Sequence, residues 1–180
     1  MTDDQVKDVK LKDWPIGDEY LTELGRISAL WGSLETALNV CLGKLAGFND
    51  LSDPTHFILF THASFPQRLD MLGTLCEHLS AAYPNLKEHP TVIGALRGAQ
   101  RLRNKYAHNG LTANESTGTI EIATGSARGT LKFSVETVSL TDLKRVSMAI
   151  HQAMLDLYKL VLKRDLRPVW ERPEDGKGER

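Results

Sequence analysis

Three features are scarce in this sequence, and each scarcity narrows the range of folds and functions. No apolar run approaches the roughly 20 residues that a helix needs to span a bilayer, and the polar, acidic start of the chain does not resemble a signal peptide. Cys41 and Cys76 are the only cysteines, too few for a disulfide framework and without the CxxC spacing of a zinc site. The formal net charge is −1, so any contact with RNA has to be a local patch of charge. We therefore expect a cytoplasmic protein with no membrane contact, no metal and no cofactor.

What the sequence does contain is helical periodicity. With 41% hydrophobic residues in 180, the chain can bury the core of one domain. Apolar residues recur at steps of three and four in several segments, which is typical of helices that pack on one face. These segments predict a helix after Gly17-Asp18 that ends at Gly47, a second from Ser64 to Tyr83, a third from about Pro90 to His108, and a last one that opens at Thr141-Asp142. Asp53-Pro54 adds a plausible short helix start.

The region between the third and the last of these helices has a different pattern. Polar and apolar residues alternate in 119–122 and in 130–135, with a glycine-containing turn between the two runs, so we predict a β-hairpin at about 117–137. The predicted fold is therefore mainly α, a four- to five-helix bundle with an inserted β-hairpin. Residues 1–17 are expected to form an arm, 18–166 the helical domain, and 167–180 a disordered tail.

The most informative segment is the polar end of the third helix, residues 101–110. We expect Leu102 and Tyr106, four residues apart, to anchor this end to the core. Arg103 and His108 are separated by five residues, or about 500° of helical rotation, which leaves their side chains about 140° apart. One regular helix therefore cannot aim both side chains at one point. Either a second copy of the helix completes the cluster, or fraying at Asn109-Gly110, which we expect to close the helix in a left-handed conformation, turns His108.

Arg103-Asn104 followed by His108 at the end of a third helix resembles the signature of the HEPN superfamily. The first long helix, with the segment Leu30–Glu35, is also similar to first helices of HEPN-like bacterial proteins. The resemblance implies a metal-independent endoribonuclease that acts as a homodimer, with the Arg and His residues of two subunits facing each other in a cleft. It further implies a toxin or anti-phage defence effector, neutralised by a cognate antitoxin such as a nucleotidyltransferase.

The residue types at this signature suit RNA cleavage by the RNA's own 2′-hydroxyl. That attack needs a proton acceptor and a proton donor near neutral pH, and the imidazole of His108 can serve in either role. The guanidinium of Arg103 offers permanent positive charge for the phosphoryl oxygens, and Asn104 can hold a phosphate oxygen or orient its neighbours. We therefore take Arg103, His108 and Asn104 as the candidate catalytic residues.

Further basic residues surround this signature, and a non-catalytic interpretation also stays open. Arg97, Arg101 and Lys105 can form an RNA-binding rim, although each can equally be an ordinary solvated charge. Glu35 of the first helix is a candidate partner for Arg101 or Arg103. Arg103 and His108 can instead merely neutralise the carbonyls at a helix end. In that case the domain would be a non-catalytic HEPN-like module that binds RNA or protein.

A second Arg/His spacing in the chain, Arg145 to His151, lies in the middle of the last predicted helix. A solvated helix face explains it better than a second functional site.

Overall fold

The computed structural model describes residues 14–50, 54–126 and 129–171, and it confirms a mainly helical fold with a small antiparallel sheet. Five α-helices lie within the described ranges: α2 (Asp18–Leu45), α3 (Thr55–Phe60), α4 (Phe65–Leu79), α5 (His89–Ala107) and α6 (Leu140–Leu162). Two short 3₁₀ helices, η1 (Pro84–Glu88) and η2 (Val169–Glu171), precede α5 and follow α6. The described part of the expected arm, 14–17, leads directly into α2, and residues 1–13 lie outside the described ranges.

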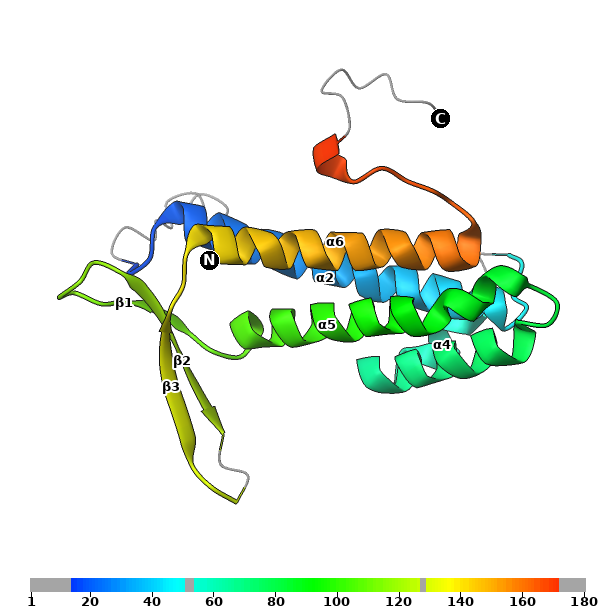
Figure 1. Ribbon diagram of the computed structural model, residues 1–180, viewed down its shortest axis with the longest axis horizontal. Helices are drawn as coiled ribbons and strands as arrows, with labels where there is room; N and C mark the ends of the chain where they lie inside the picture. The colour runs from blue at the N-terminus through cyan, green and yellow to red at the C-terminus, as the bar shows by residue number, and fades with distance from the viewer. Residues whose placement is uncertain (1–13, 51–53, 127–128, 172–180) are drawn as a thin grey trace, which may run out of the picture.

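The long helices α2 and α6 run side by side in the same direction, and α5 runs in the opposite direction along them (Figure 1). Their facing stripes form the centre of the core, where Leu34 and Leu38 of α2 and Ile150 and Leu157 of α6 are completely buried. Each such side chain contributes about 1.5–3 kcal/mol by leaving water. The shorter helix α4 packs against α2 and α5. α5 packs mainly against α6, with further contacts to α4 and α2.

Local capping explains where the helices begin. Ser64 precedes α4 and exchanges hydrogen bonds with Gln67, and Ser139 precedes α6 and does the same with Asp142. Both are capping boxes, which satisfy backbone N–H groups that the first helical turn leaves free. These contacts confirm the start predicted at Ser64, and α6 begins at Leu140, one residue before the predicted Thr141-Asp142. The end predicted at Gly47 is also confirmed, because Gly47 has a φ of 95°.

The end of α5 differs from the expectation. Neither Asn109 nor Gly110 has a positive φ. Instead, the side-chain amide of Asn109 donates to the carbonyl of Lys105 at 2.7 Å, which satisfies a terminal carbonyl without a left-handed residue. The expectation of a left-handed closure was therefore wrong.

The predicted hairpin is part of a three-stranded antiparallel sheet with the order β1-β2-β3. Its strands are β1 (Leu111–Ala113), β2 (Ile120–Ser126) and β3 (Lys132–Thr137). Leu111 pairs with Ile122, and Val135 pairs with Ala123. Ile122 is completely buried and anchors the sheet to the core, whereas β3 is exposed along its whole length. The sheet extends from the end of the bundle at which α5 terminates (Figure 1).

The segment after α6 requires two corrections. Residues 167–171 of the tail expected to be disordered contain η2, and the backbone N–H of Val169 donates to Nε2 of His151 at 3.2 Å. The ring of Trp170 packs edge-on against the same imidazole, with 5.2 Å between the ring centroids. His151 is consequently buried, so the solvated face expected for it was wrong, although Arg145 is exposed. Residues 172–180 lie outside the described ranges.

Both cysteines are free and buried in the core. Burial raises the pKa of the Cys41 thiol to about 12 and that of Cys76 to about 11, because the charged thiolate loses its hydration. Since the thiolate is the nucleophile, we expect both thiols to react with a disulfide reagent roughly 100- to 1000-fold more slowly in the native protein than in urea at pH 8. Stopped-flow thiol titration measures this ratio. Equal rates with and without urea would contradict it.

Among the described residues, no helix combines the length and the apolar character needed to cross a bilayer.

Candidate functional site

All six residues proposed from the sequence lie on α5 or at its C-terminal cap, and the packing of α5 decides which way they face. The buried positions Val92, Leu96 and Ala99 follow each other at steps of four and three. Continuing this stripe by four residues leads to Arg103 and not to Leu102. Leu102, expected to point inward, is 42% exposed, whereas Arg103 is half-buried. The expectation for Leu102 was wrong because the covered face of α5 is rotated by one residue.

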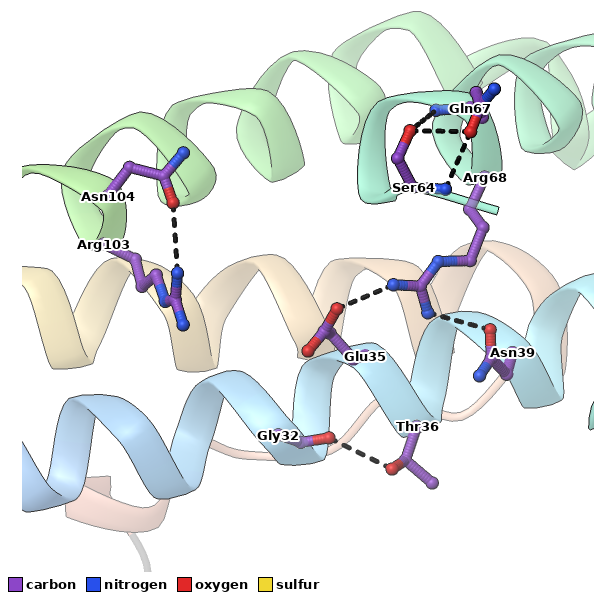
Figure 2. A network of polar contacts seen from close by, with 9 residues as sticks. All are labelled: Gly32, Glu35, Thr36, Asn39, Ser64, Gln67, Arg68, Arg103 and Asn104. Atoms are coloured by element: carbon purple, nitrogen blue, oxygen red, sulfur yellow. Dashed lines mark hydrogen bonds and ion pairs between the residues drawn. The ribbon is translucent and has the colours of Figure 1, made fainter. Parts of the chain in front are cut away.

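Arg103 therefore extends from α5 toward α2. Its guanidinium carbon lies 5.3 Å from the ring centroid of Trp31, a cation–π arrangement. Its Nη1 donates to Oδ1 of Asn104 at 3.3 Å, and Figure 2 shows the two side chains side by side. The structure thus brings two of the three candidate catalytic residues together. Trp31 itself is buried.

A second arginine, Arg68 of α4, completes a row in which two neighbouring rings lie between two guanidinium groups. The ring of Trp31 packs against that of Phe65 at 4.6 Å, and the guanidinium of Arg68 lies 5.8 Å from the ring of Phe65. Arg68 is only 7% exposed. Its two terminal nitrogens donate to Glu35 at 2.6 Å and to Asn39 at 3.0 Å, both on α2 (Figure 2). Glu35 thus pairs with Arg68, and the expected pairing with Arg101 or Arg103 was wrong.

Sequence reasoning missed Arg68, although a signal for it exists. Its position is three residues after buried Phe65 and four before buried Leu72, so it belongs to the apolar stripe of α4. An arginine in such a stripe needs an acidic or amide partner on a facing helix. Glu35 and Asn39, four residues apart on α2, supply that partner.

The basic residues proposed as an RNA-binding rim differ in their surroundings. Arg97 pairs with Asp70 at 2.9 Å, and Lys105 pairs with Glu136 of β3 at 2.7 Å. The hydrogen bond to Glu136 raises the pKa of Lys105. Such exposed pairs are worth at most about 1 kcal/mol, so an incoming phosphate can compete with them. Arg101 is exposed.

Arg103 differs from Arg68 and Arg97 in its charge environment. In the described part of the chain, no carboxylate lies within ion-pair distance of its guanidinium, whereas Arg68 and Arg97 each have one. Arg103 is thus a half-buried cation held by a ring and a neutral amide. An anionic ligand can supply the charge that the chain itself does not.

His108 is the C-cap of α5 and lies just beyond its last regular turn. Its backbone N–H bonds to the carbonyl of Asn104 at 3.3 Å, and its side chain is exposed. No hydrogen bond joins its ring to Arg103 within the described chain. One copy of the chain therefore presents an imidazole in solvent and a guanidinium directed at α2.

Two surface hollows of the chain lie away from the candidate catalytic residues. A shallow hollow of about 460 Å³ lies between α4 and α5 and is lined in part by Arg97 and Asp70. A second, of about 890 Å³, lies near the C-terminal ends of α2 and α6. Neither is lined by Arg103 or His108. Among the described residues, no group of three or more His, Cys, Asp or Glu side chains is arranged to hold a metal ion.

Comparison of the chain with models of known protein families, with curated proteins and with solved structures gave no match.

Proposed function

We propose that this protein is a metal-independent endoribonuclease of the cytoplasm that acts as a homodimer, with Arg103, Asn104 and His108 as its catalytic residues. One observation supports the proposal above the others. Arg103 is a half-buried cation without a carboxylate partner among the described residues, five residues before an exposed histidine at a helix end. A half-buried guanidinium without a carboxylate partner is favourable where an anionic ligand, such as an RNA phosphate, supplies the missing negative charge.

The residues can carry the reaction as follows. The 2′-oxygen of a ribose attacks the adjacent phosphorus, and its proton passes to the imidazole of one His108. The bond from phosphorus to the 5′-oxygen breaks, and the protonated imidazole of the other subunit's His108 donates a proton to that oxygen. The products are a 2′,3′-cyclic phosphate and a 5′-hydroxyl. Arg103 stabilises the charge that accumulates on the phosphoryl oxygens, and Asn104 fixes the guanidinium through their hydrogen bond.

The placement of the two side chains supports the homodimer. Within one chain, Arg103 faces α2 and the single His108 lies in solvent, so in this proposal the second acid–base group comes from another subunit. A two-fold axis near the C-terminal ends of two α5 helices supplies it from an identical subunit. In this proposal the enzyme is a toxin or defence effector, and its neutralising partner is an antitoxin such as a nucleotidyltransferase.

Cleavage of a labelled single-stranded RNA in EDTA tests the activity. We expect fragments that end in 2′,3′-cyclic phosphate, identified by mass spectrometry. A matched RNA with 2′-deoxyribose at the cleaved nucleotide should stay intact, because it lacks the attacking hydroxyl. Intact RNA in both reactions would rule out the activity under these conditions, and cleavage of both substrates would rule out the mechanism.

The competing function is a non-catalytic module that binds RNA or protein. The separation of His108 from Arg103 within one chain favours it, because the arginine alone suffices to bind a phosphate. This function predicts a shift of labelled RNA in a gel, or capture of a protein partner, without any product in the cleavage assay.

A further inference from the structure

The third strand of the sheet leaves an apolar surface uncovered. Phe133 and Val135 alternate along β3, so they lie on one face of the sheet, and they are 69% and 51% exposed. Leu131, directly before the strand, is 79% exposed. β3 is also an edge strand of the described structure, since it pairs with β2 alone in the order β1-β2-β3. Proteins usually cover or block an exposed apolar edge strand, because its free backbone groups pair readily with a strand of another chain.

The sheet also has little support from the bundle. Its main anchors are the buried Ile122, the ion pair between Glu136 and Lys105, and the hydrogen bond from the hydroxyl of Tyr20 to the carbonyl of Val138. All three lie at the end of the sheet nearest the helices. Within the described residues, no hydrogen bond or ion pair joins the distal part of β3, around Phe133, to a helix, and Figure 1 shows this part of the strand extending away from α5. A small sheet gains stability from additional strands.

We propose that β3 is an interface for a second copy of this chain, in which two β3 strands pair antiparallel about a two-fold axis at Ser134. In this register Ser134 faces Ser134 of the second copy, Phe133 faces Val135, and Lys132 faces Glu136. Two antiparallel copies of the strand therefore match each other, with charged residues opposite residues of the other sign and apolar residues opposite apolar residues. The proposal does not depend on RNA cleavage.

The sequence of β3 selects this register from its neighbours. Shifting the centre to Phe133 or Val135 keeps the same side chains on each face but places Lys132 opposite a residue other than Glu136. Shifting it by half a step pairs residues from opposite faces and divides the apolar surface. Only the register at Ser134 joins both exposed apolar faces and forms two Lys132–Glu136 pairs. The carboxylate of Glu136 has two oxygens, so it can accept from Lys132 of the second copy as well as from Lys105.

The pairing axis would lie on the side of the molecule that carries the candidate site. Glu136 is two residues from Ser134, about 7 Å along the strand. It bonds to Lys105 in the last turn of α5. Pairing through β3 would therefore place the C-terminal ends of two α5 helices on either side of one axis.

A disulfide across the proposed axis tests the register directly. In an antiparallel pair, directly opposed Cα atoms are about 4.5–5.5 Å apart, within the range of a disulfide. Ser134→Cys should therefore form a covalent dimer on a non-reducing gel under mild oxidation. Wild type controls for the buried Cys41 and Cys76, and Ser28→Cys, on the exposed face of α2, is the matched control. Cross-linking of S134C no faster than that of S28C would overturn the proposal.

Charge reversal provides an independent measurement that needs no new cysteine. Lys132→Glu and Glu136→Lys each place like charges opposite each other twice in the dimer. Each should raise the dimer dissociation constant by about 10-fold, measured by sedimentation equilibrium without RNA. The double variant restores both pairs and should return the constant to within about 3-fold of wild type. Because E136K and the double variant both lose the contact with Lys105, their comparison isolates the contact between subunits. A wild-type protein that stays monomeric, or a double variant no tighter than the single ones, would overturn the pairing, whatever the result of the cleavage assay.

Discussion

Arg103→Ala is expected to reduce RNA cleavage by about 100- to 1000-fold, the effect of removing one preorganised donor to a developing oxyanion. The fold should persist, because the side chain makes no salt bridge in the described structure and its contact with Trp31 is worth about 0.5–2 kcal/mol. Single-turnover cleavage under saturating enzyme measures the chemical step. Arg103→Lys should recover only part of the rate, because lysine keeps the charge but loses the planar fork.

The control for this experiment lies two residues earlier in the same helix. Arg101, a candidate residue of the RNA-binding rim, is exposed, so Arg101→Ala should weaken binding but, with saturating enzyme, stay within about 3-fold of the wild-type rate of the chemical step. His108→Ala should lose activity to a similar extent as Arg103→Ala. Cleavage by R103A at the wild-type rate would exclude Arg103 from the reaction. If R101A lost as much activity as R103A, general attraction of RNA would explain the result better than catalysis.

Arg68→Ala is expected to lower the free energy of unfolding by about 2–4 kcal/mol, more than the loss of any exposed ion pair of this chain. Removing Arg68 leaves Glu35 and Asn39 without their partner on α4. Breaking a fully buried pair costs about 3–5 kcal/mol, and the value is lower here because the side chain of Glu35 is 37% exposed. Urea unfolding monitored by circular dichroism measures the change, with the midpoint and the slope reported separately.

Two further variants define the cause of this effect. Arg97→Ala removes an arginine from the exposed pair with Asp70 and should cost less than about 1 kcal/mol. A double variant, Arg68→Met with Glu35→Gln, replaces the ion pair by apolar and neutral groups of similar size and should recover part of the loss. Equal destabilisation by R68A and R97A would show that the buried ion pair of Arg68 contributes no more to stability than the exposed ion pair of Arg97. Together, these variants separate a structural arginine from the arginine that we propose for catalysis.

Much of the helical framework was predictable from local sequence. A helix turns by about 100° for each residue, so steps of three and four between apolar residues indicate a packed face without knowledge of the partner. Capping is also local, since Ser64 and Gln67, or Ser139 and Asp142, satisfy backbone groups within one turn. β1 was missed because the three residues from Leu111 to Ala113 are too few to show a strand period. Its pairing with β2 depends on a partner that follows it in the chain.

The sequence predicted which segment carries the candidate site, but not which way its side chains point or what they contact. The residue types and their position at a helix end identified Arg103, Asn104 and His108. Which of them faces another helix depends on how α5 is rotated against α2, and a shift of one residue exchanged Leu102 for Arg103 at the covered face. The expected partner of Glu35 was wrong for a related reason. A carboxylate on one helix can reach basic residues on several neighbours, and only the packing of α4 selects Arg68.

The sequence by itself therefore determined the long helices, where α4 begins, where α2 ends and the chemical character of the end of α5, because these depend on groups within a few residues of each other. The tertiary structure alone decided that Arg103 lies half-buried against Trp31, that Lys105 bonds to Glu136, and that β3 leaves its apolar side chains exposed. Each of these depends on contacts between residues far apart in the chain, and the free energy of such contacts arises only once the elements have packed together.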